Sequence, residues 1–299
     1  MELALFSVSY AGLWGQQRLD LPRFVAKAAE LGYGAVTLMG KRPHLSPLDA
    51  DDAALQALRE CLAQHRVRCA AVAGYTDFSA QRAAEVPFAE MQFDYVGSLC
   101  RIASALEAPL VRIFTAYDDG QTPLIDAWNH VIACLRQCAE VAADFGVTLA
   151  VQNHHDVALD SAALLDLLGE VDRANVKVAF DAWSPALRGE DLYESARRMA
   201  PYTAITTNAD YVRMPRYRYR PELVNYERLQ PDMVRAVPFG DGFIDYEAFF
   251  AGLSDGGFDG PANYEMCSPI RGGGSLENLD RYARGYLEWM RQHVTSKTS

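Results

Sequence analysis

The chain has 299 residues, of which 50% are hydrophobic, and it carries a formal net charge of −11 at pH 7. A chain of this length and composition can bury a large core, as one barrel domain or as two smaller domains. The negative charge argues against a nucleic-acid-binding surface, because phosphate backbones are bound by clustered lysines and arginines.

The N-terminus and the cysteines indicate the compartment. The first residues lack the basic and apolar segments of a signal peptide, and no apolar run is long enough to span a bilayer. No Cys-x-x-Cys pair occurs, so we expect reduced and mostly buried thiols. The six cysteines are Cys61, Cys69, Cys100, Cys134, Cys138 and Cys267. We therefore expect a soluble, cytoplasmic protein without a membrane partner.

Strand-like and helix-like segments alternate from the N-terminus. The first half predicts strands at residues 3–9, 35–39, 67–73 and 110–115, and helices at 21–31, 51–65, 88–106 and 125–145. Asp20 is a suitable N-cap for the first helix, Pro22 lies in its first turn, and Gly32 ends it. In the two long helices, apolar residues recur at the spacing of one buried face.

The second half continues the alternation. It predicts strands at residues 147–152, 176–181, 203–208 and 261–266, and helices at 161–168, 191–199, 246–253 and 276–294. Eight strands alternating with helices, at intervals of roughly 30 to 40 residues, predict a single (β/α)8 TIM barrel over residues 1–294, with a C-terminal tail at 295–299. The alternative is a doubly wound open sheet, but residues 11–15 match its Gly-rich turn poorly.

One connection interrupts this rhythm, because more than fifty residues separate the seventh and eighth strands. It contains four closely spaced arginines, Arg213, Arg216, Arg218 and Arg220, interleaved with tyrosines. Long aperiodic connections in compact domains are usually functional or disordered, and the aromatic content argues against disorder. Because arginine recognises carboxylate and phosphate, we expect this loop to bind an anionic substituent of the substrate or to cover the pocket. A solvated face and a subunit contact are the alternatives.

The late strands end in polar residues. Gln152, Asp181, Asn208 and Glu265 lie at the ends of four apolar strands. Polar groups at these positions indicate a site, because a barrel core has no use for them and active sites lie at the C-terminal ends of barrel strands. His154 and His155 follow Gln152 directly, and Trp183 follows Asp181 at a position suited to stacking on a sugar.

These segments resemble the xylose-isomerase-like TIM barrels, also called the sugar phosphate isomerase/epimerase superfamily. The resemblance covers nearly the whole chain and is most specific in residues 149–154, 178–181, 237–245 and 260–265. It implies a TIM barrel that acts on small carbohydrates. Many members of that family bind one divalent metal through Glu, Asp, His and Glu from four successive late strands.

By this resemblance, Asp181 matches the family's Asp and Glu265 matches its last Glu. Gln152 stands where the first Glu is expected, and the His of the seventh strand is absent, with Thr207 or Asn208 in that region. The resemblance thus implies Mn²⁺ or Mg²⁺ held by Asp181 and Glu265, with Gln152 and Asn208 as neutral partners. Hard cations accept amide oxygens, but the loss of a carboxylate and an imidazole lowers affinity.

The same departures bear on the reaction. Family members that epimerise ketoses use the first and last Glu as an acid/base pair, and Gln152 cannot transfer a proton in this way. One base, Glu265 or His154, suffices for an isomerisation, a dehydration or a β-elimination next to a carbonyl. We therefore interpret the chain as a sugar or keto-sugar isomerase, epimerase or lyase. The alternative is a non-catalytic accessory barrel with a decayed metal site.

The expected substrate contacts are His155, Trp183, Arg213, Arg216 and Arg218. They predict a small carbohydrate substrate, anionic if the arginines bind it, and no nucleic-acid partner. A related DNA-repair endonuclease barrel is disfavoured by the six histidines and the charge of −11. The sequence leaves a homo-oligomer open.

Overall fold

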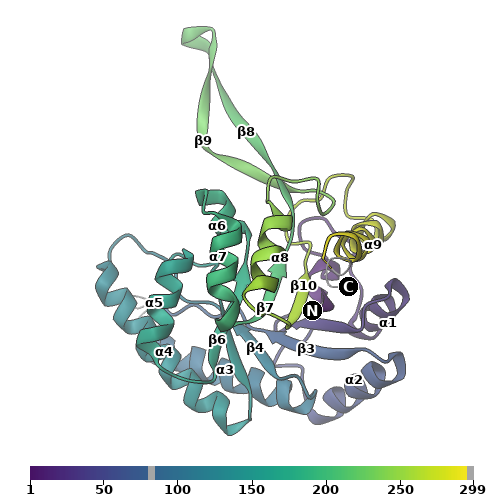
Figure 1. The fold of residues 1–299 in the computed structure, drawn as a ribbon. Helices are drawn as coiled ribbons and strands as arrows, with labels where there is room; N and C mark the ends of the chain where they lie inside the picture. Colours follow the sequence, from purple (N-terminus) through teal and green to yellow (C-terminus); the bar gives the residue numbers. More distant parts are fainter. Residues whose placement is uncertain (80–84, 295–299) are drawn as a thin grey trace.

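A closed barrel of eight parallel strands forms the centre of the molecule (Figure 1). The computed structural model describes residues 1–79 and 85–294, so the predicted tail at 295–299 lies outside the described residues. The barrel strands are β1 (Glu2–Phe6), β2 (Ala35–Met39), β3 (Arg68–Ala73), β4 (Leu110–Ile113), β5 (Thr148–Gln152), β6 (Val176–Asp181), β7 (Thr203–Asn208) and β10 (Pro261–Tyr264). Hydrogen bonds between β1 and both β2 and β10 close the sheet, which confirms the predicted TIM barrel and excludes the open sheet.

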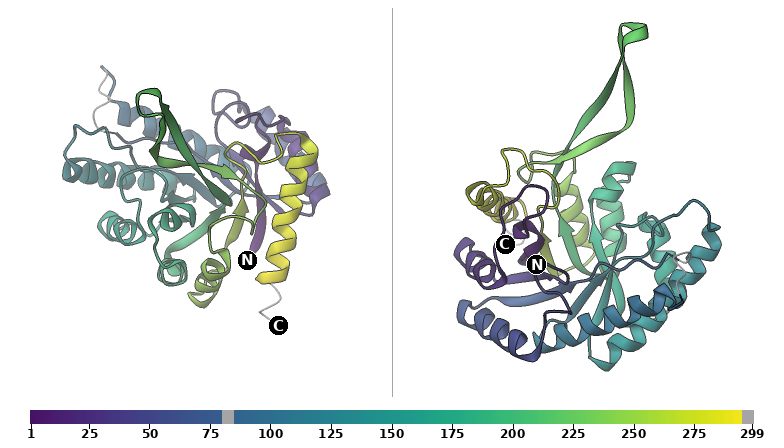
Figure 2. Two further views of the ribbon diagram at one scale, coloured as in Figure 1. Left: turned by 90° about the horizontal axis from the view of Figure 1, so that it is seen from above. Right: turned by 180° about the vertical axis from the view of Figure 1, so that it is seen from behind.

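Helices surround the barrel (Figures 1 and 2). They are α1 (Leu21–Leu31), α2 (Asp52–His65), α3 (Phe88–Ala105), α4 (Leu124–Asp144), α5 (Ser161–Val171), α6 (Trp183–Arg188), α7 (Leu192–Met199), α8 (Tyr246–Asp255) and α9 (Leu276–His293). The Asp20 side chain accepts the Arg23 N–H and thereby caps α1, as expected. Gly32 ends α1 with a φ of 98°, which favours glycine. Among the described residues, no helix has the length and apolar character needed to cross a bilayer.

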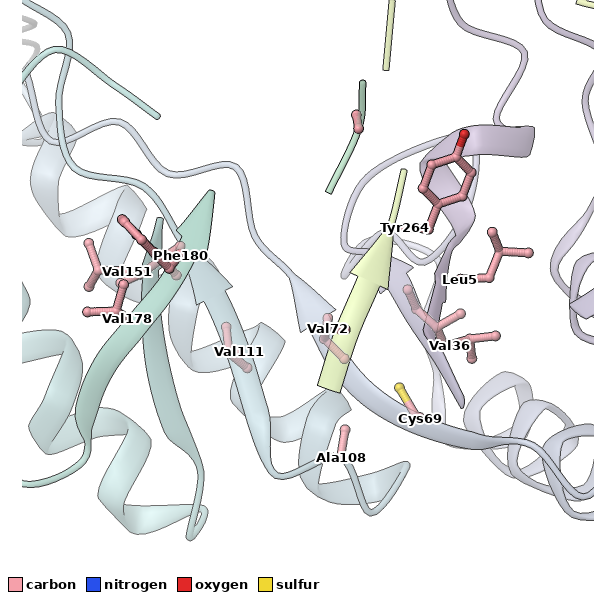
Figure 3. Packing of buried hydrophobic residues seen from close by; sticks show 14 of the residues in the cluster. Leu5, Val36, Cys69, Val72, Ala108, Val111, Val151, Val178, Phe180 and Tyr264 are labelled. Carbon is pink, nitrogen blue, oxygen red and sulfur yellow. The ribbon is translucent and has the colours of Figure 1, made fainter. Parts of the chain in front are cut away.

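The apolar core lies between the outer face of the barrel and the helices. Figure 3 shows Val72, Val111 and Val178 of three strands within this layer. A smaller cluster on alternate positions of the strands joins Ala71, Leu110, Ala150, Ala179 and Ile205. Side chains of a strand alternate between its two faces. The residue two positions after each member of this cluster therefore lies on the same face of its strand, closer to the C-terminal end of the barrel.

The long connection after β7 is a two-stranded antiparallel ribbon rather than the expected aperiodic loop. It consists of β8 (Tyr211–Arg220), the short turn η3 (Pro221–Leu223) and β9 (Asn225–Ala236). The ribbon projects away from the barrel (Figures 1 and 2). Its sequence showed no buried face because most side chains on both faces are exposed, so hydrophobic periodicity could not reveal the strands.

Candidate active site

A pocket of about 340 Å³ opens where the barrel strands end. Its lining comes from the ends of β1 to β5 and from the segment after β10. Of the predicted site residues it contains Gln152, His154, His155 and Glu265, and Asp181 is hydrogen-bonded to one of them. The residues that sequence reasoning missed include Lys41, Tyr75, Arg112 and Cys267.

Glu265 lies just past β10, and its carboxylate is almost completely buried in the pocket wall. The Cys267 thiol donates to its Oε1 over 3.0 Å, and the Tyr211 hydroxyl lies 3.0 Å from the same sulfur. Burial raises the pKa of Glu265, while the bond from Cys267 and the charge of Arg112 lower it. Burial and the charge of Glu265 raise the pKa of Cys267 well above its usual range, so the thiol keeps its proton at neutral pH.

Asp181 at the end of β6 holds Gln152 in place. The Gln152 amide donates to Oδ2 of Asp181 over 2.9 Å, and the backbone N–H of Trp183 donates to Oδ1 over 2.8 Å. Burial and the repulsion of Glu265 raise the pKa of Asp181 to about 7, and these two hydrogen bonds lower it. Asn153 adds two bonds to the Asp181 backbone, so this strand end is fixed on both sides.

Arg112 of β4 is a buried cation, and only 4% of its surface is exposed. Its Nη1 donates to the Gly74 carbonyl over 2.8 Å, and its guanidinium carbon lies 4.2 Å from the centre of the Phe114 ring. Within residues 1–79 and 85–294 it forms no ion pair, yet its charge lowers the pKa values of Asp181 and Glu265. Two positions after Leu110 of the barrel cluster, it shares that face and lines the pocket. A lone arginine in an apolar strand was the signal that could have revealed it.

A second cation stands near Arg112. The Lys41 ammonium, just past β2, lies 3.6 Å from the centre of the Tyr75 ring, and the Arg112 guanidinium lies 5.0 Å from the same ring. Burial and the charge of Arg112 lower the pKa of Lys41. The two cations give one side of the pocket a positive character that the chain as a whole lacks.

Both histidines after β5 line the pocket, because the strand ends at Gln152 and strict alternation ends with it. The His155 ring stacks between Phe114 and Tyr117, and burial lowers its pKa to about 3. Burial and the charge of Arg112 lower the pKa of His154, whose ring centre lies 5.7 Å from that of Trp183. Both imidazoles are therefore neutral at physiological pH.

Asn208 is not brought into the pocket. Ile205 of the same strand belongs to the barrel cluster, so alternation assigns Thr207 to that face and Asn208 to the opposite one. The Asn208 amide accordingly donates to the Asn263 carbonyl and to the Tyr286 hydroxyl of α9. Its expected place as a neutral metal ligand is not supported by this position.

The three arginines expected to contact substrate lie on the ribbon rather than in the pocket. Arg213 stacks over the Phe243 ring, with its guanidinium carbon 4.5 Å from the ring centre. Arg216 and Arg218 are exposed on the projecting strand β8. The cations that line the pocket are Lys41 and Arg112 instead.

The residues present do not fit a divalent metal. Besides the amide oxygens that it accepts, such a cation is usually held by several anionic or imidazole donors that meet at one point. In the described part of the chain, no three His, Cys, Asp or Glu side chains are grouped so that they could hold one. The amide nitrogen of Gln152 faces Asp181, and the cationic Arg112 acts on both carboxylates.

Comparisons place this pocket in a known fold. A D-psicose 3-epimerase from Clostridium cellulolyticum H10, solved with D-tagatose, is 18% identical with a TM-score of 0.76, covering 98% of this chain and 99% of that one. A D-allulose 3-epimerase from Methylomonas sp. is 17% identical with a TM-score of 0.74, covering 98% and 97%. The probable 3-DHS dehydratase AsbF from Bacillus anthracis is 16% identical with a TM-score of 0.73, covering 97% and 99%.

At these identities the structural likeness shows the fold alone. No curated protein sequence matches the chain closely enough to be counted. The model of one family, described as the xylose isomerase-like TIM barrel, matches residues 25–293. This match spans most of the chain, so the chain belongs to the xylose isomerase-like TIM barrel family.

Proposed function

We propose that the chain is an isomerase or lyase that removes a proton next to the carbonyl of a small, negatively charged keto-sugar or related hydroxy ketone. The observation that carries this proposal is Arg112, a buried cation in the pocket wall without an acidic partner among the described residues. Burying a charge without an ion-pair partner costs several kcal/mol in order of magnitude, so its presence calls for a function.

Arg112 suits two tasks in such a reaction. Its guanidinium can bind a carboxylate or phosphate of the substrate, and it can stabilise negative charge that develops on a carbonyl oxygen. Lys41 adds a second positive charge on the same side of the pocket. A neutral sugar would leave this side of the pocket uncompensated, which favours an anionic substrate.

Glu265 is the proposed base. Its raised pKa makes its carboxylate a better proton acceptor than an exposed glutamate, and Cys267 fixes one of its oxygens. The carboxylate takes the proton from the carbon, and the electron pair of the C–H bond moves to the carbonyl oxygen, beside Arg112. Return of the proton to the former carbonyl carbon, together with transfer of the hydroxyl proton from the deprotonated carbon's oxygen to the former carbonyl oxygen, completes an isomerisation. Departure of a hydroxyl group from the β-carbon as water, with that proton, completes a dehydration.

Gln152 and His154 limit which reaction can follow the removal of the proton. Gln152 cannot accept a proton, so the symmetric pair of bases needed for a two-base epimerisation is not complete. The neutral His154 imidazole also lines the pocket and can donate a hydrogen bond to the substrate. The family includes structures named as epimerases and as a dehydratase, which supports carbonyl-adjacent proton transfer as the common step.

The test compares charged and neutral substrates in wild-type protein and in Arg112 variants. The panel contains D-tagatose, D-fructose, D-allulose, keto-sugar acids, ketose phosphates and 3-DHS, with products identified by proton NMR. We expect turnover of acid-bearing members, and Arg112→Met should lower kcat/KM by about 10²–10³-fold, as loss of one oxyanion donor does. Arg112→Lys should retain part of the wild-type kcat/KM. Arg59→Met, on the exposed face of α2, serves as the control.

Two results would contradict the proposal. One is a preference for neutral ketoses with an unchanged kcat/KM in Arg112→Met. The other is the absence of turnover for every panel member, which would favour the non-catalytic barrel.

A further inference from the structure

The ribbon formed by β8 and β9 has two different faces. Opposite residues of an antiparallel pair share a face, and the register pairs Tyr217 with Arg228 and Tyr219 with Tyr226. One face therefore carries Tyr217, Tyr219 and Tyr226, with the last two ring centres 5.2 Å apart. The arginines Arg216, Arg218 and Arg220 alternate with them and share the other face.

This ribbon lacks the cover that such a structure needs. Tyr217, Tyr219 and Tyr226 are 59%, 50% and 65% exposed, and Val224 at the tip is 81% exposed. A two-stranded hairpin alone in water is marginally stable, and exposed aromatic stripes of this kind mark interaction surfaces. Among the described residues, Arg216 and Arg218 also have no acidic partner. The aromatic stripe and two of the arginines are thus without a partner among the described residues, whereas Arg220 and Arg228 form ion pairs within the ribbon.

The base of the ribbon is fixed, so closure over its own pocket is disfavoured. The Asp210 carboxylate accepts the backbone N–H groups of Gly240 and Gly242, over 2.9 and 2.8 Å. The Phe243 N–H donates to the Tyr211 carbonyl over 2.9 Å. These bonds clamp the first residue of β8 to the segment after β9, and the ribbon projects outward from there (Figure 2).

Charge identifies the partner. Residues 211–236 contain six arginines and three acidic residues, a net charge of +3 in a chain whose total is −11, so the remaining residues carry −14. Every copy of the chain therefore presents a basic ribbon and an acidic body. We propose that the ribbon docks on a second copy of this chain and forms a reciprocal dimer.

The body has an acidic groove whose charge is complementary to that of the ribbon. A cavity of about 460 Å³ beside the β4–α4 connection is lined by Asp118, Asp119, Asp156 and Leu124, and its described lining contains no lysine or arginine. Leu124 and the neighbouring Ile125 are 69% and 63% exposed, so aliphatic surface borders the acidic groups. The arginine face meets the aspartates, and the aliphatic stems of the arginines pack on the leucine and isoleucine.

Reach and symmetry agree with this arrangement. A ten-residue strand spans about 34 Å, enough to cross from one barrel to the next. Tyr117 lines both the groove and the active-site pocket, so the docked ribbon lies beside the partner's pocket mouth. Because each copy carries one ribbon and one groove, a two-fold axis satisfies both contacts at once.

The test measures mass by sedimentation velocity and light scattering at about 100 µM protein. Wild type should have twice the chain mass of 33.1 kDa. Arg216→Glu with Arg218→Glu should give a single-chain mass. So should Asp118→Lys with Asp126→Lys, where Asp126 is an exposed residue in the first turn of α4, next to Leu124 and Ile125. Asp119 is left intact because its side chain accepts the Gln121 and Thr122 N–H groups and holds the loop. Arg23→Glu with Arg59→Glu, on exposed parts of α1 and α2, is the matched control and should remain dimeric.

Mixing the two charge-reversed variants is the decisive arm. In the mixed pair, one contact has its original charges and the other has both charges exchanged, so a dimer should reappear. In 1 M salt, where the Debye length is about 3 Å, the wild-type dissociation constant should rise at least about tenfold. Circular dichroism and the melting temperature confirm that each variant is folded.

Three results would overturn the proposal. They are a wild type with a single-chain mass at this concentration, a dimer that survives both sets of reversals, and a mixture of the two variants that stays monomeric.

Discussion

At the scale of single residues, the pocket concentrates charge that the fold itself does not require. Asp181 and Glu265 are buried carboxyls with raised pKa values, and Arg112 is a buried cation without an ion-pair partner among the described residues. Replacing such groups with apolar side chains generally stabilises a fold, so their presence indicates chemistry.

Asp181 gives a stability prediction. Its pKa is raised to about 7 in the folded state, whereas an unfolded chain has the ordinary value near 4. The folded state therefore binds this proton more tightly, and the associated stability, complete below about pH 4, is lost as pH rises through 7. Asp181→Asn removes this loss. Between pH 5 and pH 8, the free energy of unfolding of the variant minus that of wild type should therefore rise by roughly 3 kcal/mol at most.

Urea unfolding of both proteins at pH 5 and pH 8 measures this gain. Asp52→Asn, at a fully exposed position of α2, makes the same chemical change and should show no gain. A difference between Asp181→Asn and wild type that is independent of pH would show that Asp181 does not titrate between pH 5 and pH 8, which would contradict a pKa of about 7.

Part of this site was predictable and part was not. Gln152, Asp181 and Glu265 were identified because polar residues that end apolar strands stand out in a sequence. Asn208 was wrongly expected in the site. Side chains of β7 alternate between two faces, and because Ile205 belongs to the barrel cluster, Thr207 shares its face and Asn208 lies on the opposite one. The pocket lysine Lys41, in contrast, lies in a segment after its strand, where no periodicity reports the direction of a side chain.

At the scale of elements, one junction holds the ribbon and the barrel together. Asp210 after β7 accepts the N–H groups of Gly240 and Gly242, and Tyr246 of α8 exchanges hydrogen bonds with the Ala209 backbone. The ribbon itself was not predicted, because a strand pair exposed on both faces has no hydrophobic pattern.

Gly242 tests this junction. A Cβ at this position would lie 1.8 Å from Oδ1 of Asp210 and 2.6 Å from the Tyr211 carbonyl, so the loop would have to move. Gly242→Ala should therefore lower the free energy of unfolding by about 1–3 kcal/mol, as overpacking does. Gly169→Ala in α5, where a Cβ meets nothing within 4 Å, should raise it by up to about 1 kcal/mol.

Both variants are measured by thermal and urea unfolding. Equal stability of the Gly242→Ala and wild-type proteins would show that the junction tolerates displacement, and that the ribbon is not held in one orientation.

At the scale of the whole molecule, the barrel was the most predictable feature. The alternation of strands and helices is repeated through the chain, and eight such strands predict a barrel, but closure itself is shown only by the pairing of β1 with both β2 and β10. The division of charge between a basic ribbon and an acidic body follows from the sequence alone. The proposed contact between the ribbon of one copy and the acidic groove of another could not be inferred from the sequence, because it depends on where the fold places these two surfaces.

The position of the pocket also belongs to this scale. Six segments from residue 6 to residue 267 contribute to it, so its chemistry depends on barrel closure rather than on any local motif. Arg112 and Glu265 are 153 positions apart in the chain and meet only because β4 and β10 are strands of the same barrel.

The most direct test of the proposed proton abstraction is solvent deuterium exchange, followed by proton NMR in D₂O after dialysis of the protein against EDTA. With the panel members that wild type converts, the signal of the proton next to the carbonyl should disappear. In Glu265→Gln this exchange should slow by at least about 10²-fold, the usual contribution of a general base. Exchange at the wild-type rate in Glu265→Gln, or exchange lost in EDTA and restored by Mn²⁺, would contradict a metal-free pocket in which Glu265 is the base.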